Sequence, residues 1–180
     1  MSTTIIRADI SHAASIGSIG KKSFSNAFSY LFKSKEELVE YLEYTYNPAK
    51  IARSILKESN IYFVAMLEDI PVGFVKVKLD SLNEQIESVS QMELQKIYVL
   101  PGYHGNGAGS ALLNAVLKLA NETCPDYLWL DTSSGNEGAI RLYERNGFRK
   151  IAKTYFTIGT QMFEYYLMAQ PIAIAEPCHC

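Results

Sequence analysis

The chain has 180 residues, and 48% of them are hydrophobic. This composition excludes a disordered protein, and the length suits one domain with a buried core. Seventeen basic and nineteen acidic residues leave a net charge of −2, with no basic run of the kind that binds nucleic acid. The N-terminus lacks an apolar signal core and no apolar run reaches membrane-spanning length, so we expect a cytoplasmic protein.

The first third of the chain predicts a short strand followed by three helices. Asp9 is a suitable N-cap, and Ser34 with Glu37 forms a capping box in which each side chain bonds the other residue's backbone N–H. Asn47 followed by Pro48 is a cap with proline at the first helical position. The predicted ranges are a strand over 4–7 and helices over 9–23, 34–46 and from 47 onward.

The rest of the chain predicts six strands and two helices. An apolar hairpin is followed by a polar loop, a strand, a glycine-rich turn and a periodic helix. Gly147 ends the last helix in the usual position after the C-terminus. The predicted ranges are strands over 61–67, 72–79, 92–99, 127–131, 151–156 and 162–168, and helices after the glycine turn and over 136–146. This order predicts a mixed sheet with helices on its faces, in one domain over residues 1–170, with residues 171–180 as a loose tail.

Residues 104–110, His-Gly-Asn-Gly-Ala-Gly-Ser, join the strand over 92–99 to an apolar-periodic helix. The first N–H groups of a helix have no intrahelical partner, and the helix dipole adds positive charge there. Glycines let a phosphate approach the backbone closely. Ser110 is not preceded by the lysine of a P-loop, and the spacing does not fit a dinucleotide fingerprint. We therefore expect a phosphate-bearing cofactor that is neither a nucleoside triphosphate nor a dinucleotide.

This turn resembles motif A of the GCN5-related N-acetyltransferases, Gln/Arg-x-x-Gly-x-Gly/Ala. Gly107 and Gly109 match its two small positions, whereas His104 stands where the family has Gln or Arg. Residues 136–148 resemble the family's motif B, Asn-x-x-Ala-x-x-x-Tyr followed by Gly-Phe. The resemblance covers residues 4–168. It implies a twisted, mostly antiparallel mixed sheet of about seven strands, acetyl-CoA as co-substrate, direct transfer to an amine, and no metal.

The resemblance also implies the site. Backbone groups of the central strand would pair with the pantetheine arm and the turn would hold the pyrophosphate. The implied cofactor-binding residues are Ile97, Tyr98, Val99, His104, Gly105, Asn106, Gly107, Ala108, Gly109, Ser110, Asn136 and Tyr143. Tyr143 would protonate the departing thiolate, and Glu93 would take the proton from the acceptor ammonium. The alternative for Tyr143 is a tyrosine that only packs against the sheet, and the alternative for Glu93 is a carboxylate that faces solvent.

The acceptor is less constrained. Residues 23–28, 73–77 and 92–99 look most like bacterial Pai-type spermidine/spermine N-acetyltransferases, which favours a small polyamine. The alternatives are a peptide or protein N-terminus, or a non-catalytic acyl-CoA-binding sensor. A homodimer is compatible with the family, and we expect the terminal Cys178-His179-Cys180 to be unstructured rather than a metal site. Aromatic residues that either wall an acceptor site or pack the core are Phe24, Phe28, Tyr41, Tyr44 and Tyr46.

Overall fold

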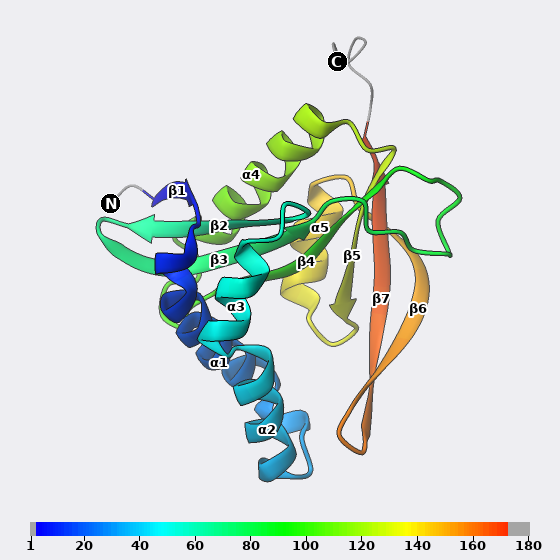
Figure 1. Ribbon diagram of the computed structural model, residues 1–180. Helices are drawn as coiled ribbons and strands as arrows, with labels where there is room; N and C mark the ends of the chain where they lie inside the picture. The colour runs from blue at the N-terminus through cyan, green and yellow to red at the C-terminus, as the bar shows by residue number, and fades with distance from the viewer. Residues whose placement is uncertain (1–2, 173–180) are drawn as a thin grey trace.

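The computed structural model describes residues 3–172, which form one seven-stranded sheet with helices on both faces (Figure 1). The helices are α1 (Ala13–Phe28), α2 (Lys35–Thr45), α3 (Pro48–Ile55), α4 (Ala108–Thr123) and α5 (Glu137–Arg145), with 3₁₀ turns at Ile10–His12 and Ser29–Leu31. The strands are β1 (Thr3–Arg7), β2 (Asn60–Leu67), β3 (Ile70–Lys78), β4 (Gln91–Val99), β5 (Tyr127–Ser133), β6 (Arg149–Ile158) and β7 (Gln161–Pro171). The predicted fold class is confirmed.

The strands are ordered β1-β2-β3-β4-β5-β7-β6, and every neighbouring pair is antiparallel except β4 with β5. β4 and β5 pair only through Gln91–Glu93 with Tyr127–Trp129. Beyond these residues β5 follows β7, to which it is paired along its whole length, and diverges from β4 (Figure 1). The sheet therefore opens between its two central strands, and one edge of β4 is left unpaired by β5.

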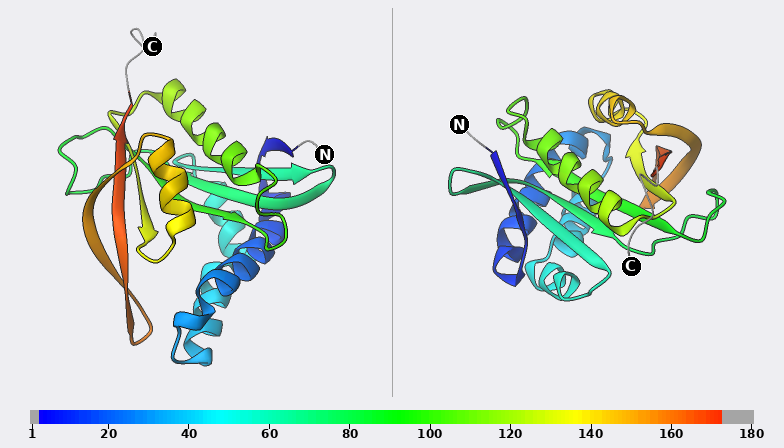
Figure 2. Two further views of the ribbon diagram at one scale, coloured as in Figure 1. Left: turned by 180° about the vertical axis from the view of Figure 1, so that it is seen from behind. Right: turned by 90° about the horizontal axis from the view of Figure 1, so that it is seen from above.

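Two apolar cores lie on opposite faces of the sheet. Seen from behind, α4 and α5 cover one face (Figure 2), where Leu112, Leu113 and Val116 are fully buried against β3 and β4. On the other face α1 and α3 pack on Val64 and Phe74. The buried residues of these helices are the apolar residues that recur at helical spacing in the sequence, as expected for helices that are stabilised by packing on a sheet. No helix within residues 3–172 is long and apolar enough to cross a bilayer.

The structure differs from the sequence-based prediction at several element ends. Asp9 caps the 3₁₀ turn before α1, and α1 continues to Phe28 rather than ending near Ser23. Ser34 accepts from the Glu37 N–H at 3.2 Å as predicted. The reciprocal bond of the capping box is absent from the described contacts because the Glu37 carboxylate binds Thr160 in the β6–β7 turn instead. Propensity rules cannot foresee such a tertiary partner.

The C-terminal strand is longer than predicted. β7 continues through Pro171, and the Ile172 N–H donates to the Asp126 carbonyl at 2.9 Å. Pro171 and Ile172 thus add to the edge of the fold beside β5, where the sequence suggested the start of a tail. The Cys178-His179-Cys180 segment lies outside the described residues.

Candidate active site

The glycine turn at the end of β4 has the backbone that a phosphate site requires. Gly102, Gly105 and Gly107 have φ values of +89°, +82° and +80°, in the left-handed region that favours glycine. Nothing lies within 4 Å of the Cβ position at Gly105 or Gly107, so the turn is open on its outer side. α4 begins at Ala108, and the first intrahelical bond runs from Ala111 N–H to the Gly107 carbonyl. The N–H groups of residues 108–110 are thus directed to the open side, as anion binding needs.

The Val99 carbonyl joins this turn to α1. It lies 2.9 Å from His104 Nε2 and accepts from the Ser23 hydroxyl at 3.1 Å. The His104 side chain, expected to contact the cofactor, is therefore directed back to the strand end. Two donors therefore occupy this carbonyl oxygen. The Leu100 N–H donates to the Val72 carbonyl, so by alternation along the strand the backbone groups of Tyr98 also face β3 and those of Ile97 face the opening.

A narrow cavity of about 70 Å³ occupies the opening between β4 and β5. Four predicted residues meet there, namely Ile97, Tyr98, Asn136 and Tyr143. The Asn136 side chain caps α5 by accepting from the Ala139 N–H at 3.2 Å. Tyr143 is 5% exposed, and its ring meets Phe148 edge-on with centroids 5.7 Å apart. Burial raises the pKa of Tyr143 above its ordinary value, so its hydroxyl stays protonated and can donate.

A β-bulge marks β4 beside this cavity. Lys76 of β3 pairs with Lys96, whereas Val77 pairs with Leu94, so Gln95 is the extra residue. A bulge leaves its extra residue unpaired in the ladder, and Gln95 lines the opening. The sequence showed no sign of this bulge because β4 reads as an ordinary apolar strand.

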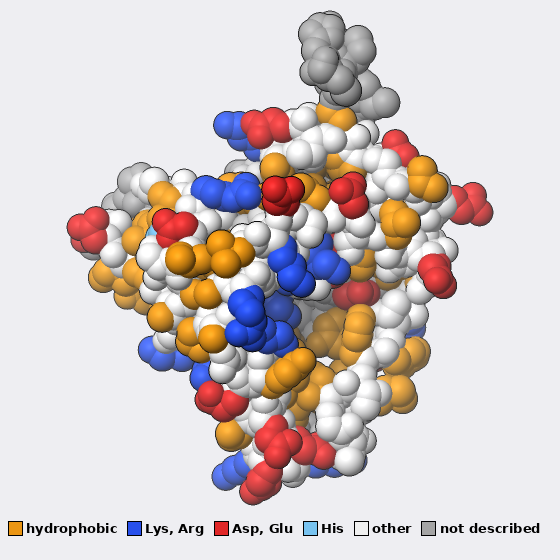
Figure 3. Space-filling view, viewed as in Figure 1, with side chains coloured by type: hydrophobic (Ala, Val, Ile, Leu, Met, Phe, Trp, Pro, Cys, Tyr) orange, Lys and Arg blue, Asp and Glu red, His pale blue; other side chains and the backbone are white. Residues whose placement is uncertain are grey.

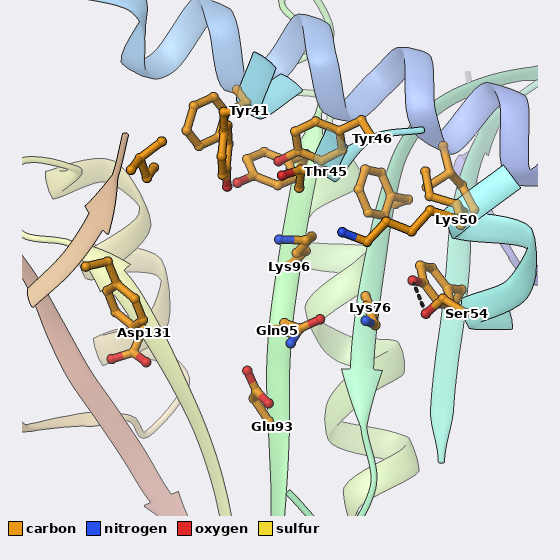
Figure 4. A pocket seen from close by; sticks show the side chains of 18 of the residues that line it. Tyr41, Thr45, Tyr46, Lys50, Ser54, Lys76, Glu93, Gln95, Lys96 and Asp131 are labelled. Atoms are coloured by element: carbon orange, nitrogen blue, oxygen red, sulfur yellow. Dashed lines mark hydrogen bonds between the residues drawn. The ribbon is translucent and has the colours of Figure 1, made fainter. Parts of the chain in front are cut away.

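A larger cavity of about 460 Å³ adjoins the opening on the face covered by α1–α3 (Figure 4). The two cavities share five lining residues: Gln95, Lys96, Tyr98, Asp131 and Tyr165. Phe24, Tyr41 and Tyr46 line the larger one and Phe28 lines the smaller. All four also pack in the apolar core on this face, so neither of the two expected roles excludes the other. Tyr44 is 72% exposed and instead stacks under the Lys50 ammonium at 3.5 Å.

Two carboxylates from neighbouring strands line the larger cavity. Glu93 on β4 accepts from the Ser81 hydroxyl at 2.7 Å and pairs with Lys78 at 3.3 Å. Asp131 on β5, which we did not single out from sequence, accepts from the Thr154 hydroxyl at 3.0 Å. Burial, with a further contribution from the negative charge of Glu93, raises the pKa of Asp131 above its usual range. The predicted base thus lies in the cavity, but beside a second candidate.

Three lysines line the same cavity, Lys50 on α3, Lys76 on β3 and Lys96 on β4. Burial, with the positive charges of Lys96 and Lys78 adding to it, lowers the pKa of Lys76 to about 8. Burial also lowers the pKa of Lys96, against the opposing effect of Glu93. Sequence reasoning missed all three. For the two strand lysines a signal was available. Lys76 lies two residues after Phe74 and Lys96 two residues before Tyr98, so each lysine shares the inward face of its strand with that aromatic residue.

Taken together, the opened sheet and the glycine turn at a helix N-terminus define a protein that holds an extended, phosphate-bearing ligand along β4. Comparison with known proteins agrees. The model of the acetyltransferase (GNAT) family matches residues 24–148. An N-alpha-acetyltransferase of Saccharolobus solfataricus is 31% identical over 125 residues, covering 65% of this chain and 73% of that protein. The chain belongs to the acetyltransferase (GNAT) family.

Other similarities cover less of the sequence or concern the fold alone. An uncharacterized N-acetyltransferase of Mycobacterium tuberculosis is 36% identical over 81 residues, which is 45% of this chain and 52% of the relative, so the match spans about half of that protein. The crystal structure of a PaiA N-acetyltransferase from Thermoplasma acidophilum in complex with coenzyme A superposes with a TM-score of 0.76 at 18% identity, covering 95% of this chain and 99% of the other. At that identity the likeness concerns the fold.

Proposed function

We propose that this protein is an acetyl-CoA-dependent N-acetyltransferase that moves the acetyl group directly to a primary amine. The observation that carries the proposal is the continuity of the two cavities. The opening between β4 and β5 is lined by Ile97, Tyr98 and Tyr143, and it shares its inner lining with the cavity that contains Glu93 and Asp131. A thioester entering along β4 would therefore meet an amine entering from the other face.

The residues present fit acetyl-CoA as co-substrate. Free N–H groups at the start of α4 and the open turn would hold the pyrophosphate, and the unpaired edge of β4 would receive the pantetheine arm as an added strand would. The amine nitrogen would form a bond to the acetyl carbon while the carbon–sulfur bond breaks. A backbone donor near the Gln95 bulge would stabilise the negative charge that develops on the carbonyl oxygen.

Two protons must move in this reaction. An amine reaches the site mainly as ammonium, since its reference pKa is about 10.4, and one proton must leave before attack. We assign this step to the pair Glu93 and Asp131, which line the acceptor cavity together. Tyr143, kept protonated by burial, would give a proton to the sulfur as coenzyme A departs, and the proton that the nitrogen loses as the amide forms would restore Tyr143 to its protonated state. The presence of these groups favours an enzyme over a non-catalytic acyl-CoA sensor.

The chemical class of the acceptor amine is a separate question from the reaction. The sequence favoured a polyamine such as spermidine, with a peptide or protein N-terminus as the alternative. The cavity of about 460 Å³ has the size of a small-molecule site, which supports a small acceptor. Its three lysines oppose the entry of a polycation, and this weighs against spermidine and spermine.

The test is acetyl transfer itself. The purified protein is incubated with acetyl-CoA and a panel containing spermidine, spermine, aryl amines, amino acids and short peptides, and free coenzyme A thiol is measured. Acetyl-CoA binding is measured in parallel by calorimetry. Thiol release that depends on an added amine supports the enzyme. Tight binding without release on any acceptor would favour the sensor, and absence of binding would overturn the assignment of the turn.

A further inference from the structure

Lys76 and Lys96 face each other across neighbouring antiparallel strands at the floor of the acceptor cavity. Residues directly opposite in such a pair have side chains in contact range on the same face, and like charges there destabilise the sheet. The next pair along, Lys78 with Glu93, carries opposite charges and forms an ion pair at 3.3 Å. The chain thus gives one cross-strand lysine an ion-pair partner and leaves Lys76 and Lys96 without one among the described residues.

Lys50 adds a third positive charge from the helix above. Within residues 3–172, none of these three lysines forms an ion pair with a carboxylate. Their other neighbours are aromatic faces, with Lys76 5.7 Å from the Tyr62 ring centre and Lys96 5.8 Å from that of Tyr46. Half-buried ammonium groups without an ion-pair partner are costly, and a ligand carboxylate would supply such a partner.

The charges of the cavity are divided by position. In Figure 4 Lys50 lies beside the helices and Lys76 on β3, whereas Asp131 lies across the opening on β5 and Glu93 lies further along β4. Lys96 lies between these groups and lines both cavities. A group of basic side chains also borders one side of the hollow on this face in Figure 3. The turn that would hold the cofactor pyrophosphate, residues 104–107, contributes nothing to the lining of this cavity. The lysines are therefore placed for the acceptor rather than for coenzyme A phosphates.

Resting on the proposed function, we propose that the acceptor is a small amine that also carries a carboxylate, as a free amino acid does. Its amine lies toward Glu93 and Asp131, where it loses a proton and meets the thioester. Its carboxylate lies among Lys50, Lys76 and Lys96 and supplies the ion-pair partner that these lysines do not have in the described part of the protein. The lysines thereby select against diamines and polyamines, because a second ammonium group would meet three like charges.

The test compares acceptors of equal length that differ only at the far end. 5-Aminopentanoate ends in a carboxylate, pentylamine in a methyl group and 1,5-diaminopentane in a second amine. A set of α-amino acids paired with their α-amides makes the same comparison for a nearer carboxylate. We expect kcat/KM for the carboxylate member of a series to exceed that of its neutral partner at least about tenfold, with the diamine poorest.

Variants connect this preference to the lysines. Lys76→Met and Lys50→Met remove the charge and keep a long side chain, and neither residue lines the opening that holds the thioester. We expect each to reduce the ratio of kcat/KM for 5-aminopentanoate to that for pentylamine to about threefold or less. Lys118→Met on the exposed surface of α4 is the matched control. Equal rates for carboxylate and neutral acceptors, or a preference for the diamine, would overturn the inference while leaving the acetyltransferase in place.

Binding gives a readout that needs no turnover. Calorimetry on the protein saturated with coenzyme A measures the Kd of 5-aminopentanoate, pentylamine and 1,5-diaminopentane. We expect the amino acid to bind at least about tenfold more tightly than the other two, with an affinity that falls at high salt and in Lys76→Met. Equal affinities would overturn the inference even if no acceptor is acetylated. Failure of coenzyme A itself to bind would instead count against the proposed function.

Discussion

Glu37 on α2 and Thr160 in the turn between β6 and β7 are joined by two hydrogen bonds. The Glu37 carboxylate accepts from the Thr160 hydroxyl at 2.9 Å and from its N–H at 3.2 Å. Next to this contact Gln161 bonds the backbone of Leu31 and Lys33. Residues from both elements line the acceptor cavity, so this contact fixes the two walls of the cavity relative to each other across the opened sheet.

Loss of this contact should loosen the acceptor site. Thr160→Val keeps the shape of the side chain and removes the hydroxyl donor. We expect the KM for the acceptor to rise about threefold or more, with the Kd for acetyl-CoA unchanged, and a stability loss of about 0.5–1.5 kcal/mol. Steady-state kinetics and thermal unfolding measure the two effects. Glu40→Gln, an exposed carboxylate on the same helix, is the control, and an equal effect of both variants would show that the contact has no special role.

Tyr143→Phe tests the proposed acid. The phenylalanine retains the edge-on contact with Phe148 and the buried position, so thermal stability should change little. Removal of a general acid should lower kcat about 10²-fold or more, with the KM for acetyl-CoA unchanged. Since burial raises the pKa of Tyr143, we expect no loss of activity from its ionisation between pH 7 and pH 10. A variant with the kcat of the wild type would remove Tyr143 from the chemistry.

Asp131 and Glu93 can be separated by the pH dependence of kcat/KM. A base must be ionised, so activity falls as the pH drops through its pKa. The pKa of Asp131 is raised by burial and, secondarily, by the charge of Glu93. Asp131→Asn should therefore abolish the acidic limb of the profile. Glu93→Gln removes a negative charge and should move that limb to lower pH. Loss of the limb in Glu93→Gln instead would assign the base to Glu93 alone.

Gly107→Ala and Gly109→Ala separate backbone conformation from access to the phosphate. Gly107 has φ +80°, where a Cβ costs about 1–2 kcal/mol, whereas Gly109 lies inside α4 and its Cβ would meet only Val99 at 3.9 Å. We expect Gly107→Ala to lower the free energy of unfolding by about 1 kcal/mol and Gly109→Ala to leave it nearly unchanged or slightly raised. Both should weaken acetyl-CoA binding, as measured by calorimetry. Wild-type affinity in both variants would show that the turn does not hold the cofactor.

The cofactor side of the site was predictable from sequence, whereas the acceptor side was not. The glycine turn and the Asn136–Tyr143 helix are local patterns, and local patterns determine caps, turns and helix faces. The Gln95 bulge depends on the register between β3 and β4, which a single strand does not encode. Likewise Lys76 and Lys96 become neighbours only when β3 and β4, which are separated by the polar loop, pair with each other. The distribution of charge along the sequence did not indicate that these two lysines lie in one site.

Lys76 should impose a measurable cost on stability. Its pKa is about 8 in the folded protein against 10.5 in the unfolded chain, because of burial and the charges of Lys96, Lys78 and Lys57, with Glu93 opposing. Below pH 8 both states carry the proton and the cost is fully present. Between pH 8 and 10.5 the unfolded chain binds more protons, so stability rises with pH as the cost is relieved.

Lys76→Met should therefore be more stable than the wild type at pH 7. The full shift would correspond to roughly 3 kcal/mol, and the partial exposure of Lys76 to solvent reduces the expected gain to about 1 kcal/mol, or about 2–4 °C in Tm. The gain should shrink toward pH 10.5, as measured by urea unfolding at both pH values, while Lys118→Met changes little at either. A Lys76→Met protein that is less stable at pH 7 would refute the assigned cost. A more stable variant that has also lost the carboxylate preference would show that the chain retains this lysine for its substrate at the expense of its fold.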